Sequence, residues 1–297
     1  MSITITVFTP TYNRCGLLVR CYHSLQKQSC KDFVWLIVDD GSTDGTGSVV
    51  SEWIEEEKSF EIDYIWKENG GLHTAYNKAI EQINTTLCVC IDSDDWMPED
   101  AIEIILKTWE KRGSENVAGI VGLDCYEDGR VIGDLLPEQD TVNLIDLLIG
   151  KYNINNGDRT NVVRTAVYRQ FAPMKSFPGE RFFSPHYMHI QISRKYDFLV
   201  LNKCLRFVEY QPDGLSASIL HQYKNSPRSF IETRKLYLSL PESPLSFRLR
   251  NSIHLASSCY LSGNILASIK INNHKCLAVM SLPFGFALGL YIQYCVK

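Results

Sequence analysis

Three aspartates, Asp92, Asp94 and Asp95, stand within four positions directly after the apolar segment 86–91. Such a short β-rich segment is typical of a strand buried on both faces of a parallel sheet. Its acids then lie at the carboxyl end of the strand, where open α/β sheets bind ligands. Carboxylates this close repel one another, and a divalent cation would neutralise them. Because oxygen-only ligands suit Mg²⁺ or Mn²⁺, the spacing predicts a site for one of these ions. The alternative is that the acids of this segment cap the helix that follows.

The elements that must position these acids alternate between strand and helix. Apolar and β-branched runs predict strands over 3–8, 33–38, 62–66, 86–91 and 117–123, and apolar periodicity predicts helices over 14–28, 72–83 and 142–149. This recurrence is typical of an α/β fold in which a mostly parallel sheet with right-handed crossovers is flanked by helices. Beyond residue 210 the pattern is longer, more basic and less regular, which predicts a boundary near residue 212.

Polar groups also follow the other predicted strands. Thr9–Asn13 ends the first, Asp39 and Asp40 end the second, and Asn69–Gly71 lies between the third and a helix. An acid at the second strand end can accept hydrogen bonds from a base or a ribose. Glycines let backbone N–H groups approach a phosphate at the start of a helix. The four strand ends therefore predict one site for a nucleoside diphosphate. Neither a Gly-x-Gly-x-x-Gly nor a Walker motif is present, which disfavours an ordinary dinucleotide or P-loop site.

Composition limits the partners and the compartment. The chain has 297 residues, a formal charge of −4 and a pI near 6.0, so no broad basic surface is available for nucleic acid. Ten cysteines are scattered without a paired framework, which favours small buried hydrophobes in a reducing cytoplasm. The N-terminus shows no basic region followed by an apolar core, so no signal peptide is predicted.

The C-terminal segment differs from the rest. Residues 276–296 carry no charge, a length that could just span a bilayer. Pro283, Gly285 and Gly289 dilute the apolar run, which favours a segment lying at a membrane surface or partly inserted. A buried final helix is the alternative.

Four motifs in order resemble those of family 2 glycosyltransferases: Thr9–Arg14, Val38–Thr46, Asn69–Leu72 and Asp92–Asp95. The resemblance is strong over residues 3–112 and fades after about residue 216. It implies a glycosyltransferase A-type catalytic domain over 1–212, followed by a C-terminal helical, membrane-associated region over 213–297. It also implies a nucleotide-diphospho-sugar donor, with UDP favoured as the nucleotide.

The resemblance further implies roles by position. Asp95 would be the direct Mn²⁺ or Mg²⁺ ligand, and Asp94 would lie nearer the ribose. The remaining donor-binding positions form two groups. The nucleoside group comprises Thr9, Pro10, Thr11, Tyr12, Arg14, Asp39 and Asp40. The diphosphate group comprises Asn69, Gly70 and Gly71. For Asp39 the alternative is an aspartate that closes a turn.

Enzymes of this family resemble one another in inverting the anomeric centre by direct displacement, which requires a general base for the acceptor hydroxyl. An acid is expected shortly after the segment 179–182, but the sequence has Phe183–His186 there. His186 is the nearest group able to take a proton. Glu180 competes with it, and both could instead be structural.

The leading hypothesis is a transferase that adds a sugar to a glycan or lipid-linked acceptor in surface polysaccharide synthesis, at the cytoplasmic face of a membrane. One alternative is a non-catalytic sugar-nucleotide-binding protein that has lost its base. Another is a sugar-phosphate nucleotidyltransferase, which would want a glycine-rich basic loop after the first strand, where Thr9–Asn13 lacks glycine.

Overall fold

The computed structural model describes residues 5–212, 214–215 and 217–296, so residues 3 and 4 of the first predicted strand lie outside it. The strands are β1 (Ile5–Thr11), β2 (Phe33–Asp39), β3 (Glu61–Trp66), β4 (Leu87–Cys90), β5 (Val117–Cys125), β6 (Thr141–Val142), β7 (Arg159–Arg164) and β8 (Asp197–Phe207). The helices are α1 (Cys15–Gln26), α2 (Thr46–Glu56), α3 (Leu72–Gln82), α4 (Ala101–Arg112), α5 (Leu144–Leu148), α6 (Thr165–Phe171), α7 (His186–Ile192), α8 (Ile219–Asn225), α9 (Pro227–Leu238), α10 (Leu245–Leu261), α11 (Ala267–Ile271) and α12 (Lys275–Cys295).

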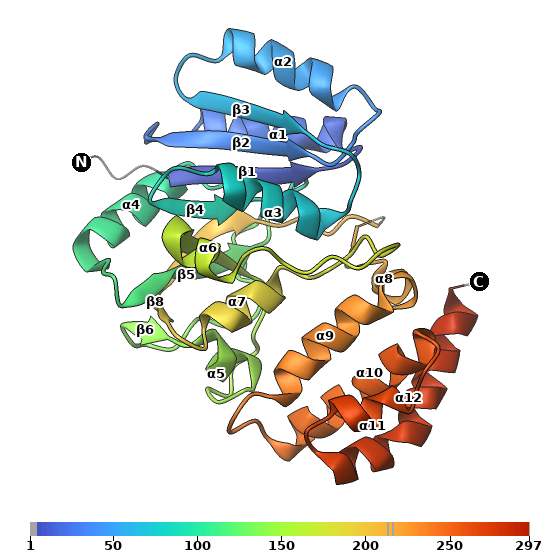
Figure 1. Cartoon of the computed structure of the whole chain (residues 1–297). Coiled ribbons are helices and arrows are strands. Elements are labelled where there is room, and N and C mark those ends of the chain that lie inside the picture. Colours follow the sequence, from blue (N-terminus) through green and yellow to red (C-terminus); the bar gives the residue numbers. More distant parts are fainter. Residues whose placement is uncertain (1–4, 213, 216, 297) are drawn as a thin grey trace. The chain divides into compact units, whose positions relative to one another are not determined.

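All eight of these strands form one mixed sheet in the order β3-β2-β1-β4-β7-β5-β8-β6 (Figure 1). The first four run parallel, as expected for strands joined by helical crossovers. β7 is antiparallel to both β4 and β5, and β6 is antiparallel to β8. This confirms the predicted α/β sheet flanked by helices.

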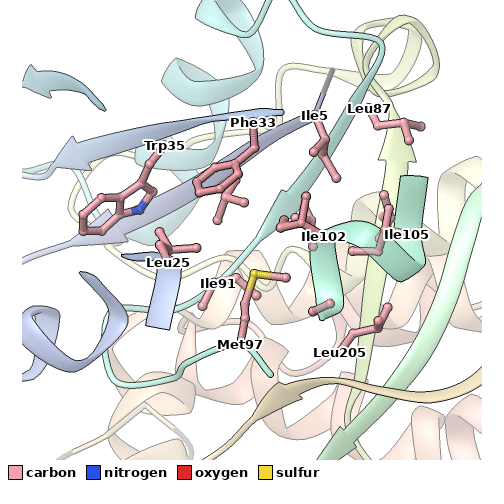
Figure 2. Packing of buried hydrophobic residues seen from close by; sticks show 14 of the residues in the cluster. Ile5, Leu25, Phe33, Trp35, Leu87, Ile91, Met97, Ile102, Ile105 and Leu205 are labelled. Carbon is pink, nitrogen blue, oxygen red and sulfur yellow. The ribbon is translucent and has the colours of Figure 1, made fainter. Parts of the chain in front are cut away.

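One core covers one face of the sheet. Apolar side chains of α1, α2 and α4 pack there against alternate residues of the strands, among them Ile5, Trp35 and Leu87 (Figure 2). The other face carries α3 and α6, which contact each other. The rings of Phe8 in β1 and Tyr76 in α3 meet edge-on there, with their centroids 5.0 Å apart. Side chains alternate along a strand, so each side chain of β1 points either into the core beside α1, α2 and α4 or toward the face that carries α3 and α6.

The predicted helix over 142–149 is wrong at its start. Thr141 and Val142 instead form β6, paired with Leu199 and Phe198 of β8. Asn143 then caps α5, because its side-chain oxygen accepts a hydrogen bond from the backbone N–H of Ile145 at 2.9 Å.

The chain divides into two compact units. The first unit comprises the residues up to Met174 together with Met188–Glu209, and the second comprises Lys175–Tyr187 together with the residues from Tyr210 on. The second unit contains eleven Lys and Arg against four Asp and Glu, a formal charge of +7, so the first carries −11 of the total of −4.

Helices dominate the second unit. α12 packs along α10, with Gly285 close to Ala256 and Gly289 close to Tyr260. Its outward side exposes large apolar residues, with Met280, Phe284 and Tyr294 each more than 60% exposed. Within the described part of the chain, α12 is the one helix long and apolar enough to cross a membrane, judged by length and composition. The prediction of a buried final helix is therefore met on one side of α12 alone.

Candidate functional site

Four strand ends meet at one edge of the sheet in the first unit. Thr11 of β1 pairs with Asp39 of β2, and the backbone N–H of Lys67, after β3, donates to the carbonyl of Asp39 at 2.9 Å. On the other side of β1, the N–H of Ile91 donates to the carbonyl of Phe8 at 3.1 Å. Parallel pairing thus brings all four predicted motifs to the carboxyl edge, where α/β sheets bind ligands.

The loops after β1 and β2 are tied to each other. The N–H of Asn13 donates to Ser42 Oγ at 2.9 Å, and the N–H of Thr43 donates back to Asn13 Oδ1 at 2.8 Å. The N–H of Cys15 donates to Asp44 Oδ2 at 2.9 Å. Asn13 adopts a left-handed conformation, φ 51°, which asparagine tolerates better than most residues. Much of the motif sequence therefore fixes loop geometry.

Asp40 is buried and binds the loop after β3. Its carboxylate accepts hydrogen bonds from the N–H groups of Gly70 at 3.0 Å and Gly71 at 2.7 Å, and pairs with Lys67 Nζ at 2.5 Å. In this structure Asp40 accepts from both glycine N–H groups, so the contact of these groups with a phosphate stays a prediction. The loop after β3 packs closely here because glycine has no Cβ. At Gly70 an added Cβ would lie 2.7 Å from Thr74 Oγ1.

Asp39 closes a turn. Its Oδ1 accepts from the N–H of Ser42 at 2.7 Å, and its Oδ2 accepts from the Tyr64 hydroxyl at 2.6 Å. These contacts match the turn-forming alternative raised from the sequence. Burial and this hydrogen bond raise the pKa of Tyr64 above its ordinary value, so the phenol stays protonated and donating.

The residues of the motif at the end of β1 divide between the core and the surface. Thr9 follows Ile5 and Val7 on the core face, where its hydroxyl accepts from Trp35 Nε1 at 3.0 Å and its side chain is 0% exposed. The structure thus places the Thr9 side chain in the core, Pro10 is buried as well, and their contact with a nucleoside stays a prediction. Thr11 Oγ1 is buried without a hydrogen-bond partner among the described residues, and Tyr12 is 46% exposed.

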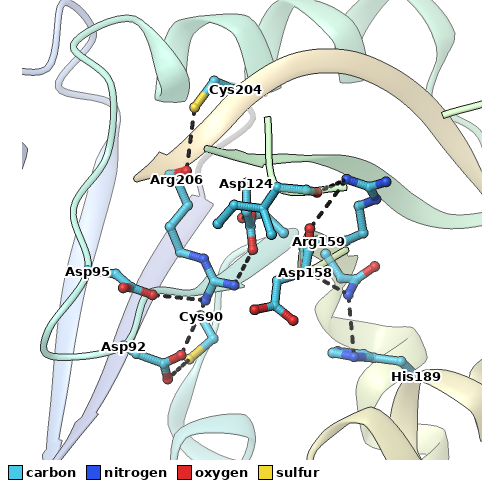
Figure 3. Close-up of polar contacts among 12 residues, drawn as sticks. Cys90, Asp92, Asp95, Asp124, Asp158, Arg159, His189, Cys204 and Arg206 are labelled. Carbon is cyan, nitrogen blue, oxygen red and sulfur yellow. Dashed lines mark hydrogen bonds and ion pairs between the residues drawn. The ribbon is translucent and has the colours of Figure 1, made fainter. Parts of the chain in front are cut away.

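An arginine lies among the acids at the end of β4 (Figure 3). Arg206 of β8 pairs through Nη1 with Asp92 Oδ2 at 3.2 Å and Asp95 Oδ2 at 3.3 Å, and through Nη2 with Asp124 of β5. Asp124 also accepts from Thr160 Oγ1 at 2.6 Å. Burial lowers the pKa of Arg206, but the three carboxylates outweigh it and hold that pKa well above its ordinary value. Charge neutralisation, which the sequence argument assigned to a divalent ion, is thus partly provided by the protein.

Asp94 and Asp95 differ in burial and in their pairing with Arg206. Asp95 is buried and paired with Arg206, whereas Asp94 is half-buried and outside that pairing. Burial raises the pKa of both carboxyls; Arg206 opposes the rise at Asp95, and Asp92 adds to it at both. Arg20 fixes the loop by donating to the Asp94 carbonyl at 2.6 Å while its guanidinium lies over Trp96.

The donor set fits a hard cation only in part. Carboxylate oxygens suit Mg²⁺ or Mn²⁺, yet the described residues contain no group of three or more His, Cys, Asp or Glu able to hold a metal ion. A cation at Asp94 therefore needs further oxygen ligands from outside the protein, such as those of a diphosphate.

The two candidate bases lie in the second unit. Glu180 accepts from the N–H groups of Arg228 and Ser229, from Ser229 Oγ and from Arg228 Nε, all at 2.8–2.9 Å. It thereby binds the otherwise unpaired N–H groups at the start of α9, a structural role. His186 begins α7, half-buried, with its ring 6.4 Å from that of Tyr237. The neighbouring His189 is buried in the first unit and hydrogen-bonded to the Tyr168 hydroxyl at 2.5 Å.

Sequence reasoning missed Arg206, Lys67 and Arg20. Arg206 is 114 positions from Asp92, so no local spacing pointed to it. A buried cation was nevertheless implied by the density of carboxylates.

Comparison with known proteins establishes the family. The family described as Glycosyl transferase family 2 matches residues 6–176, more than half of the chain. The chain belongs to this family.

Individual relatives match over shorter stretches. The putative teichuronic acid biosynthesis glycosyltransferase TuaG of Bacillus subtilis is 33% identical over 99 residues, 33% of this chain and 39% of TuaG. The chain spans less than half the length of the first curated relatives that it matches.

Solved structures support the fold over nearly the whole chain. S. aureus TarS 1–349 in complex with UDP-GlcNAc has a TM-score of 0.59 at 18% identity, covering 95% of this chain and 80% of that one. The mannosyltransferase PcManGT from Pyrobaculum calidifontis, in complex with GDP-Man and Mn²⁺, also has 0.59 at 18% identity, covering 98% and 82%. The glycosyltransferase A-type fold inferred from the motifs is confirmed.

Replacing Arg206 tests the charge balance of the acid cluster. Arg206→Met keeps much of the side-chain volume but leaves Asp92, Asp95 and Asp124 without their counter-charge. We expect a loss of about 3–5 kcal/mol in the free energy of unfolding, since a buried ion pair is broken on one side. Urea unfolding at pH 7 measures it. Arg130→Met, which removes an exposed pair with Asp128, is the control and should unfold as the wild type does. Equal midpoints for the two variants would contradict the role given to Arg206.

Proposed function

We propose that this protein is an inverting glycosyltransferase that moves a sugar from a nucleotide-diphospho-sugar, with UDP as the nucleotide, to a glycan or lipid-linked acceptor in surface polysaccharide synthesis. The observation that carries the proposal is the meeting of the ends of β1, β2, β3 and β4 at one edge, which brings all four motifs together there, two of them with acids. Membership of the family supports the reaction type.

The nucleoside end of the donor lies, in this proposal, against the ends of β1 and β2. Tyr12 offers an exposed ring on which a base can stack, and Thr11 Oγ1 offers a buried hydroxyl with no partner among the described residues. Asp40 is rigidly held by Gly70 and Gly71 and meets the base through the edge of its carboxylate. Asn69 Oδ1, also buried and without a partner in the described part of the chain, adds an acceptor for a ligand hydroxyl. Arg14 and Asp39 complete this group, Asp39 by supporting the turn.

In this proposal Asp95 and Asp94 would together hold a divalent cation. When bound, such an ion would neutralise the charge of the departing diphosphate. Arg206 orients Asp95 and opposes the rise that burial gives the pKa of its carboxyl, and Arg20 fixes the backbone of Asp94. The protein thus provides a pre-positioned carboxylate rather than a complete metal site.

His186 is the general base, since the Glu180 carboxylate is already occupied by four hydrogen bonds at the start of α9. In the neutral state an imidazole nitrogen accepts the proton of the acceptor hydroxyl as that oxygen attacks the anomeric carbon. The C–O bond to the diphosphate breaks as the new bond forms, which inverts the centre.

In this proposal the enzyme works at the cytoplasmic face of a membrane, and two features of the second unit support this setting. Its charge of +7 suits anionic lipid, and α12 exposes apolar and aromatic residues without a charge between 276 and 296. TuaG is named for teichuronic acid biosynthesis, which supports a role in polysaccharide synthesis.

Calorimetric titration of UDP with and without Mn²⁺ tests the donor site. Because Asp94 and Asp95 make an incomplete site, we expect weak binding of Mn²⁺ alone and tight binding with UDP present. Asp94→Asn should remove the Mn²⁺ enhancement; altering even an outer partner of a metal site costs about 10- to 100-fold in affinity.

Asp100→Asn, an exposed acid a few residues along the same segment, is the matched control and should leave the enhancement intact. UDP binding that is indifferent to Mn²⁺ would exclude the proposed cation site. Absence of UDP binding would exclude the donor site itself.

Release of UDP from UDP-sugars tests the base. His186→Asn should lower turnover by about 10²- to 10⁴-fold, the usual contribution of a positioned base, while UDP affinity stays unchanged. Glu180→Gln is the matched comparison, expected to lower the melting temperature but to keep turnover in the folded protein.

The reverse order of the two turnover effects would make Glu180 the base. Nucleotide binding without turnover in the wild type, under any tested donor, would favour the non-catalytic sugar-nucleotide-binding protein.

Vesicle co-sedimentation tests the membrane surface. We expect binding to phosphatidylglycerol vesicles and little binding to phosphatidylcholine vesicles, since each basic residue near an anionic surface contributes about 1 kcal/mol. Phe284→Glu should weaken binding, and Leu135→Glu, an equally exposed apolar position in the first unit, should not. Equal sedimentation of Phe284→Glu and wild type would contradict the assignment to α12.

A further inference from the structure

A cavity of about 160 Å³ lies within the second unit and has no part in the donor site described above. It is lined by residues of the segment before α7, the first residue of α8 and one side of α9: Phe182, Phe183, Ser184, Ile219, Ser229, Phe230, Thr233, Arg234 and Tyr237. The rings of Phe182 and Phe230 stack at 5.7 Å with an angle of 28° between their planes. The walls are thus mainly the faces and edges of aromatic rings.

The cavity adjoins the proposed base. Ser184, which lines it, precedes His186 by two positions. The ring of Tyr237, which also lines it, meets the His186 ring nearly edge-on, at 6.4 Å and 79°. Through Ser184 and Tyr237, two walls of the cavity are thus close to the group proposed to take a proton from the acceptor.

The walls are held rigidly by contacts within the second unit. Glu180 accepts from Ser229 Oγ at 2.8 Å at the start of α9, and Thr233 donates to the carbonyl of Ser229 at 3.0 Å. Arg234 donates from Nη1 to Asn251 Oδ1 at 2.8 Å and from Nη2 to the Tyr223 hydroxyl. Its Nε is buried without a hydrogen-bond partner among the described residues. A donor thus stays available on a side chain that lines the cavity.

Size and chemistry indicate the ligand class. A cavity of roughly 150 Å³ accommodates one six-membered ring such as benzene. Aromatic faces suit the C–H faces of a sugar ring, and binding pockets commonly combine apolar walls with a few polar groups that fix orientation. The Arg234 N–H can donate to a sugar oxygen, and the +7 charge of the unit favours an acceptor that bears acidic groups.

We propose that this cavity binds one pyranose ring of the acceptor glycan and so places its hydroxyl beside His186. The inference rests on the proposed glycosyltransferase function and adds an acceptor subsite to it. The aromatic walls favour a sugar ring that presents a C–H face. Arg234 favours a sugar with an oxygen atom at the edge of that ring.

Saturation-transfer difference NMR on the full chain tests the subsite. The probes are methyl glycosides of the common hexoses, N-acetylhexosamines and hexuronic acids, together with UDP in the same sample. The wild type should transfer saturation to the ring protons of at least one glycoside. Ser184→Phe, which fills the cavity, should lose that response and keep the response of UDP.

Ser262→Phe is the matched control, an exposed serine after α10 that does not line the cavity, and it should behave as the wild type. A glycoside response that survives in Ser184→Phe, or no glycoside response in a wild type that binds UDP, would overturn the subsite. A wild type that binds no UDP would overturn the proposed function instead. A response of butyl phosphate that Ser184→Phe removes, without any from the glycosides, would assign the cavity to an alkyl chain.

Discussion

The candidate site depends on holding several carboxylates close together around one buried arginine. Asp92 and Asp95 follow β4 and Asp124 belongs to β5, with β7 between these strands, and Arg206 of β8 lies among the three acids. The guanidinium suits this place because it presents several donors in a fixed plane and stays charged when buried. With Arg206 among them these three carboxylates are held together by the protein itself, and Asp94 stays outside that pairing.

The motifs that carry the family resemblance serve the fold as much as the ligand. Asn13, Ser42 and Asp44 tie two loops together, and Asp40 holds the loop that contains Gly70 and Gly71. Such bracing lowers the entropy that a ligand would otherwise have to pay for in ordering the loops. In the proposed donor site, Tyr12, Thr11, Asn69, Asp40 and Asp94 are the groups offered to the donor.

The two units differ in sign of charge and in the kind of surface that they present. The first, at −11, holds the acidic edge that calls for a cation, whereas the second, at +7, carries α12 and the aromatic cavity beside His186. The proposed function assigns donor binding to the sheet, and contact with the acceptor and the membrane to the helical part, in keeping with these compositions. Glu180 stabilises the second unit by binding the N–H groups at the start of α9.

The sequence by itself determined the parallel strands β1 to β4, the order of the four motifs and hence the family, because apolar runs, turn residues and acids at strand ends are local signals. The tertiary structure alone decided how the polar groups are used. The direction of Thr9 depends on which layer β1 faces, the N–H groups of the glycines depend on where Asp40 lies, and the neutralising charge comes from Arg206, 114 positions from Asp92. Hydrogen-bond partners and counter-charges are set by distance in space, which the spacing of residues along the chain does not encode.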